Sequence, residues 1–333
     1  MKAFAVVLII TATVIAGVMG YRARTQNTAN TSLPIVKYGF IPFPGTFPYL
    51  VAIDKGFFKE EGVDVQIVDE VDYLKMNEDV AMGVVDFQSQ YVLIDVVDAV
   101  SRGKDLKVVM ATDYSNGADA IVAKKTIETV VDLKGKKVGV ANGTLSQYLL
   151  SDALRKNNLS LSDVIQVDLN SLDAALAFTK GEVDAAVSWE PDVTKAVNEG
   201  NGWRLYTSVE SPGLIIDCLV FRSEFVKLYP ERVAGVVRGY MKAMDFIASN
   251  PDASYGIGAK YSKVTVPEFA EQLKGVKLMT RTDNVGLMYY KSSIDSLHGS
   301  VNQAYLFLKT LGLVSNPVDS TTIIDPNFIR NLP

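Results

Sequence analysis

Residues 47–65 read FPYLVAIDKGFFKEEGVDV, and this stretch decides the fold of the chain. Pro48 suits the first turn of a helix, where its missing N–H is not needed. Gly56 stands where a left-handed residue commonly ends a helix. Gly62 then turns the chain into residues 63–67, whose alternation of apolar and polar side chains indicates a strand. The stretch therefore predicts a short helix, its cap and a strand.

A second strand is predicted immediately upstream, at residues 33–40. A strand, a loop, a helix and a further strand in this order open a parallel α/β sheet. The loop at residues 41–47 then lies at the carboxyl end of the first strand, where open sheets bind ligands. We therefore expect an α/β fold with a ligand near this loop.

Composition excludes several classes of protein. The 333 residues, of which 48% are hydrophobic and 21% charged, suffice for about two domains with a sizeable core. The net charge is −5 and no run of Lys and Arg occurs, so we expect no nucleic acid as a partner.

The chain has one histidine, His298, and one cysteine, Cys218. A zinc site built from Cys and His needs three or four such ligands and is therefore excluded, and a lone Cys forms no internal disulfide. A Ser-His-Asp triad would have to use His298, which lies in a polar stretch far from every glycine loop. We expect no metal, no cofactor and no catalytic residue.

Residues 3–20 are almost uncharged and predict an export signal or a membrane anchor. Residues 18–20 suit the cleavage positions of a signal peptidase, yet the length is at the lower limit for a membrane-spanning helix, so cleavage and retention both stay open. Lys2 on one side and Arg22 and Arg24 on the other leave the orientation open. No Cys follows this segment. We therefore expect an exported protein, in the periplasm or on the outer face of the cytoplasmic membrane, that is not a lipoprotein.

The pattern Gly-x-Val-Asp occurs twice, at residues 83–86 and 181–184. An amphipathic segment precedes each glycine, at residues 73–82 and 173–180. In each half we expect the glycine to end a helix and Val-Asp to open a short strand. The repeated context predicts two similar α/β lobes.

The second lobe is predicted to start with a strand at residues 138–140. A helix at residues 147–156 follows, with Ser146 as its N-cap. The next strand is predicted at residues 164–167. Strands that alternate with helices indicate a parallel sheet with right-handed crossovers.

Two apolar runs, at residues 118–123 and 214–221, are predicted to be buried strands that cross between the lobes. A helix is expected from Pro230 to the Asn-Pro pair that begins at residue 250, and another at residues 301–311. Residues 316–333 are expected to form an extended tail that docks through its apolar side chains.

The opening stretch resembles a known family. A proline-led helix that runs into Ala-x-x-x-Gly-Phe-Phe-x-x-Glu-Gly-Val-x-Val is similar to the start of the solute-binding proteins of ABC importers for nitrate, sulfonates, taurine and thiamine precursors. The matching residues are Ala52, Gly56, Phe57, Phe58, Glu61, Gly62, Val63 and Val65. The resemblance continues to about residue 250.

This resemblance implies the fold of a type II periplasmic binding protein, whose two lobes are mainly parallel sheets that close on a ligand by hinge motion. Together with the two crossing strands, it places residues 34–117 and 218–333 in lobe 1. Residues 118–217, with the hinge strands, form lobe 2. An export segment (residues 1–20) and a linker (residues 21–33) precede them.

Five loops are expected to face the cleft between the lobes. Their candidate ligand-binding residues are Phe43, Thr46 and Phe47 in the first loop, Gln88, Ser89 and Gln90 in the second, Asn142, Gly143, Thr144 and Ser146 in the third, Trp189 and Glu190 in the fourth, and Asp217 in the fifth. The resemblance places ligand contacts in the second loop, and the Trp-Glu-Pro triplet of the fourth is common in the family.

Each loop has a structural alternative to ligand binding. Aromatic rings of the first loop could stack on a planar ligand or pack onto their own lobe. The glycine turn at residues 142–146 offers backbone N–H groups and a helix dipole to an anion, or is a plain N-cap. Glu190 could bind an amine or start a helix. Asp217, in an apolar strand, is costly to bury unless it is paired, so it is a candidate for a cationic group or an inter-lobe hydrogen bond.

We expect an extracytoplasmic substrate-binding protein that delivers a small polar organic molecule or an oxyanion to an ABC permease, as a monomer and without chemistry. The ligand is a sulfonate, taurine, nitrate or a pyrimidine-type thiamine precursor. The candidate loops carry no Arg or Lys, which disfavours a doubly charged anion, and their aromatic and acidic residues favour an aromatic heterocycle or an amine.

Two alternatives stay open. One is an enzyme of the same fold, in pyrimidine or menaquinone-type biosynthesis, because fold does not fix function. The eukaryotic thiamine-pyrimidine synthases that resemble this family depend on an active-site His and a Cys-rich iron motif, which His298 and Cys218 cannot build. The other is a membrane-tethered sensor domain, which would need a retained anchor and a signalling partner.

Overall fold

The computed structural model describes residues 33–70, 72–288 and 295–332. The expected export segment and the polar residues that follow it, up to residue 32, lie outside these ranges. Within them, no helix has both the length and the apolar character needed to cross a membrane. From Ile35 onward the chain forms one unit that contains two sheets.

The first sheet has six strands in the order β11-β4-β10-β3-β1-β2. These strands are β1 (Ile35–Phe40), β2 (Asp64–Asp69), β3 (Phe87–Val92), β4 (Leu106–Ser115), β10 (Ile216–Arg222) and β11 (Val276–Leu278). The second sheet has five strands in the order β7-β6-β8-β5-β9. They are β5 (Asp119–Lys124), β6 (Lys137–Val140), β7 (Ile165–Asp168), β8 (Ala185–Trp189) and β9 (Gly202–Thr207).

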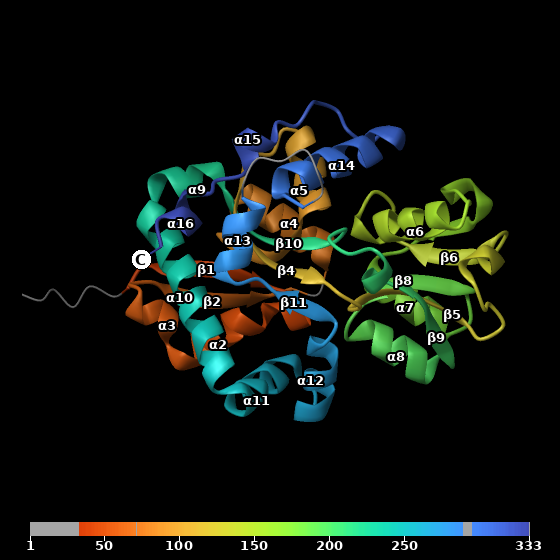
Figure 1. Cartoon of the computed structure of the whole chain (residues 1–333), viewed down its shortest axis with the longest axis horizontal. Helices are drawn as coiled ribbons and strands as arrows, with labels where there is room; N and C mark the ends of the chain where they lie inside the picture. Colours follow the sequence, from red (N-terminus) through yellow and green to blue (C-terminus); the bar gives the residue numbers. More distant parts are fainter. Residues whose placement is uncertain (1–32, 71, 289–294, 333) are drawn as a thin grey trace, which may run out of the picture. The chain divides into compact units, whose positions relative to one another are not determined.

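Helices surround both sheets (Figure 1). Those that follow strands of the first sheet are η1 (Pro44–Thr46), α2 (Phe47–Lys55), α3 (Phe57–Glu60), α4 (Tyr73–Met82), α5 (Leu93–Ser101), α9 (Ser223–Leu228), α10 (Pro230–Ser249), α11 (Pro251–Ser262), α12 (Val266–Leu273), α13 (Arg281–Leu287), α14 (Leu297–Thr310), α15 (Ser320–Ile323) and α16 (Asn327–Arg330). Those that follow strands of the second sheet are η2 (Val130–Leu133), α6 (Leu145–Lys156), η3 (Leu161–Asp163), α7 (Ser171–Thr179), α8 (Asp192–Glu199) and η4 (Ser208–Glu210).

The two-lobed α/β fold is confirmed. In the first sheet β1 pairs in parallel with β2 and β3, and in the second β6 pairs in parallel with β7 and β8. Antiparallel pairs join β10 to β3 and β4, and β5 to β8 and β9. The two strands expected at the crossings are β5 and β10, and at each of them the chain changes sheet.

The aspartate of the repeated Gly-x-Val-Asp pattern makes the same kind of hydrogen bond in both lobes. The Asp86 carboxylate accepts a hydrogen bond from the Lys37 backbone N–H at the start of β1, at 2.7 Å. The Asp184 carboxylate accepts one from the Lys137 N–H at the start of β6, at 3.1 Å. Each aspartate therefore ties the turn after a helix to the neighbouring strand, which a sequence repeat alone did not reveal.

Three local predictions were wrong. The second candidate loop is not a loop, because β3 begins only at Phe87 and contains Gln88–Gln90. The N-cap of α6 is Thr144, whose Oγ1 accepts from the Ser146 N–H at 3.2 Å, so Ser146 lies inside the helix. The tail is not extended throughout, because α15 and α16 form there; Ile324 is buried between them and pairs with Val108 of β4.

The opening stretch forms α2, a left-handed Gly56 with φ 77°, α3 and β2. Phe58 of α3 is buried against α10. A Cβ atom at Gly239 of α10 would lie 2.3 Å from the Phe58 ring, so glycine permits this contact. The Phe58 side chain thus anchors the opening stretch to a helix that lies far along the chain.

We expect Gly239→Ala to destabilise the protein by about 1–3 kcal/mol, because the added methyl overfills this contact. The matched control is Gly256→Ala in α11, where a Cβ atom would meet nothing within 4 Å. That change should stabilise by about 0.5–1 kcal/mol through helix propensity. Urea denaturation measures both, and equal effects of the two changes would contradict the packing argument.

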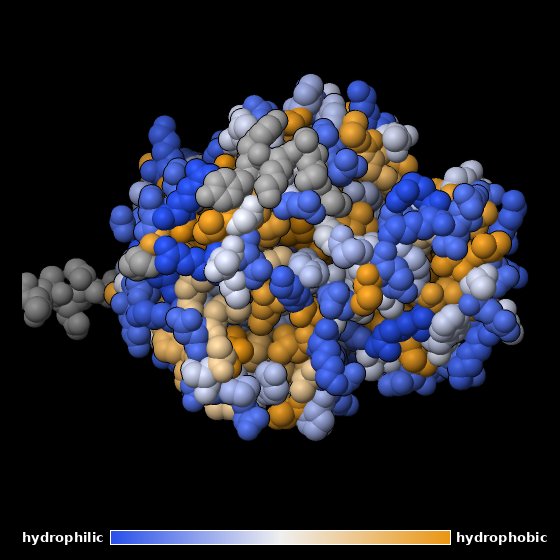
Figure 2. Space-filling view, in the orientation of Figure 1, coloured by the Kyte–Doolittle hydropathy of each residue, from blue (hydrophilic) through white to orange (hydrophobic). Residues whose placement is uncertain are grey.

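Figure 2 shows hydrophilic side chains around the rim of one face and apolar side chains gathered toward the middle of the part that contains the first sheet. A contact between the lobes lies beyond the crossing strands: the rings of Tyr148 (α6) and Phe307 (α14) have centroids 4.7 Å apart. Helix α14, which follows the first sheet, therefore reaches the second lobe.

Candidate functional site

A cavity of about 200 Å³ lies between loops of the two sheets, and a recess of about 20 Å³ continues it inward. The cavity and the recess share Ile41, Tyr73 and Trp189. The cavity is further lined by Pro42, Asp72, Leu74, Ala141, Thr144, Asn170, Ser171, Leu172, Pro191, Asp192 and Lys195. The recess is further lined by Phe43, Gln90, Val92, Asp119, Leu145, Ile215 and Asp217.

The parallel strands explain why these residues meet. Ile41 follows β1, Tyr73 begins the helix after β2, and Asn170 caps the helix after β7. Thr144 caps the helix after β6, and Trp189 ends β8. The carboxyl ends of parallel strands gather at one edge of a sheet, and the two edges face each other across the cavity.

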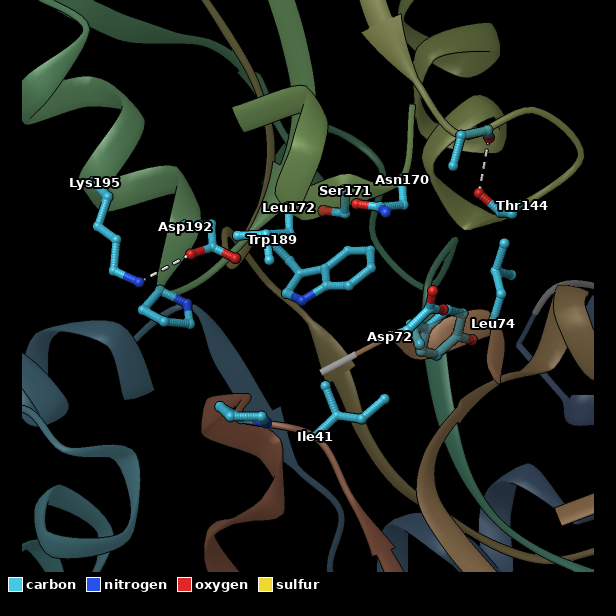
Figure 3. A pocket seen from close by; sticks show the side chains of 14 residues that line it. Ile41, Asp72, Leu74, Thr144, Asn170, Ser171, Leu172, Trp189, Asp192 and Lys195 are labelled. Atoms are coloured by element: carbon cyan, nitrogen blue, oxygen red, sulfur yellow. Dashed lines mark hydrogen bonds and ion pairs between the residues drawn. The ribbon is translucent and has the colours of Figure 1, made fainter. Parts of the chain in front are cut away.

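Trp189 occupies the middle of the cavity (Figure 3). Its ring lies edge-on to the Tyr73 ring, with centroids 5.6 Å apart. The Tyr73 hydroxyl donates to Asp95 Oδ2 at 2.6 Å and accepts from the Val92 N–H at 3.1 Å. Because two hydrogen bonds fix the Tyr73 hydroxyl and hence its ring, the two rings form a preorganised aromatic wall.

The recess ends in carboxyl groups. Asp119 and Asp217 line it, each 3% exposed. Asp217 on β10 stands opposite Asp113 on β4, which is fully buried. Asp113 Oδ2 accepts from Gln90 Nε2 at 3.3 Å and from Thr112 Oγ1 at 3.2 Å, whereas no N–H or hydroxyl group of the described residues donates to its Oδ1.

Burial raises the pKa of Asp113 and of Asp119 to about 7. The hydrogen bond with Asp217, followed by those from Gln90 and Thr112, opposes this rise in the pKa of Asp113. The pKa of Asp217 rises further, first through burial and then through the nearby charges of Asp113 and Asp119. Two carboxyl groups this close cannot both ionise easily, so Asp217 is the member of the pair that keeps a proton.

More acidic than basic side chains line the cavity and its recess. Asp72, Asp119, Asp192 and Asp217 stand against one cation, Lys195. Lys195 Nζ already lies 3.0 Å from Asp192 Oδ1 at the outer end (Figure 3). The inner end is therefore acidic and aromatic, and it contains no basic side chain among the residues that line it. In the described ranges, the cavity included, no group of three or more His, Cys, Asp or Glu is arranged to hold a metal ion.

Five of the residues expected at the ligand line the cavity or its recess. They are Phe43, Gln90, Thr144, Trp189 and Asp217. They come from four of the five candidate loops and from β3. The structure thus brings together residues that are far apart in the sequence.

Four expected residues of the first lobe point into its body instead. The Phe47 ring packs on Phe269 of α12, with centroids 5.1 Å apart, at the start of a helix that packs on α10 and α11. Thr46 Oγ1 donates to the Phe43 carbonyl at 2.7 Å and closes a local turn. Ser89 Oγ lies 2.6 Å from the Tyr38 hydroxyl, and the Gln88 amide is buried in β3 without a hydrogen-bond partner among the described residues.

The glycine turn of the second lobe does not offer its N–H groups to the cavity. The Asn142 N–H donates to Asp168 at 3.1 Å, and the Gly143 N–H donates to Gln147 Oε1 at 2.9 Å. The Ser146 N–H is held by Thr144. Side chains within the lobe therefore satisfy the donors that were expected to bind an anion.

Glu190 lies outside the cavity and is already paired. Its Oε1 lies 2.6 Å from a nitrogen of Arg204 and accepts from Thr194 Oγ1 at 2.9 Å. The carboxylate is 4% exposed. Arg204 therefore pairs with the Glu190 carboxylate, which the sequence offered as a partner for a ligand amine.

The sequence argument missed Tyr73, Asp119, Asn170, Ser171 and Lys195. A signal for three of them existed, because Tyr73 follows β2 and Asn170 and Ser171 follow β7, at strand ends where ligands bind. Asp119 sits at the start of a strand that runs the other way, so its place at the cavity follows only from the sheet order. Lys195, one turn into α8, carried no signal.

A family model described as "NMT1/THI5 like" matches residues 44–254. This chain is 26% identical over 294 residues to a protein of Brucella abortus (strain 2308) that is named as a binding protein. The match covers 85% of this chain and 88% of that protein. The 4-amino-5-hydroxymethyl-2-methylpyrimidine phosphate synthase THI13 of Saccharomyces cerevisiae is 24% identical over 225 residues, 63% of this chain and 65% of that protein.

Among solved structures, the chain is similar to the periplasmic aliphatic sulphonate binding protein SsuA from Escherichia coli. The TM-score is 0.72 at 22% sequence identity, and the match covers 89% of this chain and 93% of that one. This similarity shows a shared fold.

Proposed function

The chain belongs to the NMT1/THI5-like family, and from this premise we propose that it is the extracytoplasmic substrate-binding protein of an ABC importer. It captures a small organic molecule between its lobes, closes on it, and presents the closed form to a permease. It acts outside the cytoplasmic membrane, as a monomer, and performs no chemical step.

The observation that carries this proposal is the cavity, because both lobes contribute its walls. Ile41 and Tyr73 come from the first lobe, and Thr144 and Trp189 come from the second. A ligand in this position contacts both lobes at once and therefore favours the closed state over the open one. Hinge opening between the lobes releases it again.

The related yeast synthase makes an enzyme the second candidate. The two residues with the most versatile catalytic chemistry, His298 and Cys218, do not line the cavity. His298, at the start of α14, has its Nδ1 2.9 Å from Ser320 Oγ of α15. Cys218 is buried in β10. The contents of the cavity therefore support binding over catalysis.

A thermal-shift panel of sulfonates, nitrate, taurine, aminopyrimidines and amines tests the proposal. A tight ligand should raise the free energy of unfolding by about 3–4 kcal/mol at several-hundred-fold excess over its Kd. Mass spectrometry of the same samples should recover the ligand unchanged. Conversion of a ligand into a product would favour the enzyme, and silence across the whole panel would contradict the binding function.

Trp189→Ala should weaken any panel ligand by about tenfold to a hundredfold, since the indole supplies a central wall of the cavity. Its effect on the melting temperature of the ligand-free protein should be small. The other tryptophan is the control: Trp203 Nε1 donates to the Ile127 carbonyl at 2.9 Å, away from the cavity. Trp203→Ala should lower stability and leave calorimetric affinity unchanged, and the reverse pattern would assign Trp189 to the core.

A further inference from the structure

We infer that the ligand is a small organic cation, with an ammonium, guanidinium or amidinium group held at the Asp119–Asp217 end of the cavity. The inference rests on the proposed function. It narrows the proposed ligand classes to cations and excludes the anionic sulfonates and nitrate.

The first step is the charge of the lining. Asp119 and Asp217 are almost fully buried, and no basic residue lines the recess with them. An anion placed there would be repelled by groups that water cannot screen, whereas a cation would be attracted. At the outer end, Lys195 is neutralised by Asp192 and adds little attraction for an anion.

The second step is a buried carboxyl pair that the chain leaves without a cation. Asp113 and Asp217 face each other from neighbouring strands and share a hydrogen bond. No N–H or hydroxyl group of the described residues donates to Asp113 Oδ1. Buried charges in proteins are normally paired. Because no basic residue lines the recess, a ligand that lends its positive charge to the Asp113–Asp217 pair would offset the cost of burying it.

The third step is the aromatic surroundings. Phe43, Tyr73 and Trp189 border the same recess. Aromatic faces attract organic cations, most strongly when the site excludes water. They also accept the apolar body that carries the charged group. Carboxylates and aromatic rings together suit an amine on a flat or short hydrocarbon frame.

The test compares cations and anions on the same carbon skeleton. The whole mature protein is titrated by calorimetry with benzylamine against phenylmethanesulfonate, with butylguanidine against butanesulfonate, and with an aminopyrimidine at a pH where its ring is protonated. We expect at least one cation to bind with one-to-one stoichiometry and its anionic counterpart not to bind. A sulfonate that binds while its amine does not would overturn the inference and leave the binding function standing.

Two substitutions locate the charge. Asp217→Asn and Asp119→Asn should each weaken the bound cation at least tenfold. The control is Asp98→Asn on α5, which removes the same charge from the first lobe but does not line the cavity; it should change the affinity less than twofold. Equal affinity in wild type, Asp217→Asn and Asp119→Asn would overturn the inference. If neither the cations nor the anions bind, the inference is wrong. If no compound of the wider thermal-shift panel binds either, the binding function is contradicted as well.

Discussion

Asp217→Asn should raise the stability of the ligand-free protein by about 1–2 kcal/mol at pH 8, although Asp217 lines the site. Asp217 and Asp113 face each other from neighbouring strands, both buried. An asparagine amide there can donate to Asp113, as the protonated Asp217 carboxyl does. At pH 8 the folded protein must keep a proton on Asp217 that the unfolded chain releases, because burial raises the pKa of Asp217 well above 3.8. Asparagine keeps the hydrogen bond without this cost, so the folded state gains stability.

Urea denaturation of the ligand-free protein at pH 8 measures this gain. Asp98→Asn is again the control, because Asp98 pairs with the exposed side chain of Arg102 on the same helix and such i,i+4 pairs contribute little. A gain in stability joined to a loss of ligand affinity is typical of a binding residue that is strained without its ligand. A large loss of stability in Asp217→Asn would show instead that the carboxyl is a structural bond between strands.

Raising the pH from 5 to 8 should lower the free energy of unfolding of the ligand-free protein by a few kcal/mol, on the order of one for each unit of pKa shift. Burial raises the pKa of Asp95, Asp113 and Asp119 from 3.8 to about 7. Between these values the folded protein holds protons that the unfolded chain has released. This stabilisation is complete below the ordinary pKa and is lost as the pH rises toward 7.

Other groups oppose this trend only weakly in the same window. Carboxylates with a lowered pKa, such as Glu61 and Asp184, lose their stabilising effect below their ordinary values, hence outside it. The pKa of His298 is lowered mainly by burial, so stability should rise with pH around its ordinary 6.5, but the side chain is only partly buried. Denaturation at pH 5, 6, 7 and 8 gives the slope. Asp217→Asn should flatten it, and stability that increases steadily across this range would contradict the buried acidic cluster.

The family resemblance drawn from residues 47–65 is confirmed by the family model that covers residues 44–254. The helix, the left-handed Gly56 and the strand that follows were predictable because each depends on residues close together in the sequence. Local sequence patterns did not predict an element's bounds correctly where a residue far away in the sequence determines them. The strand at Phe87 begins late because Asp86 first binds Lys37 of another strand.

Side chains expected near strand ends lie at the cavity, whereas the expected backbone donors have partners within their own lobe. Trp189 at the end of β8 and Asp217 on the crossing strand β10 both line the recess. Gly143 was expected to present a free N–H group, but Gln147 reaches back from α6 and accepts its hydrogen bond. Glu190 could have met a ligand, but Arg204 on β9, two strands away in the same sheet, neutralises it. These partners are set by three-dimensional packing.

The sequence by itself determined the class of fold and the family, because alternation, glycine caps and the proline-led helix act over a few residues. The aromatic and acidic residues of the sequence already favoured an amine or a heterocycle, but only the tertiary structure placed the carboxyl groups together at one end of the cavity. It sets Asp113 and Asp217 face to face and brings Asp119 beside them from the other sheet. It also pairs the N–H groups of the glycine turn with side chains of their own lobe. Electrostatic preference depends on distances between groups that are remote in the chain, and only folding fixes those distances.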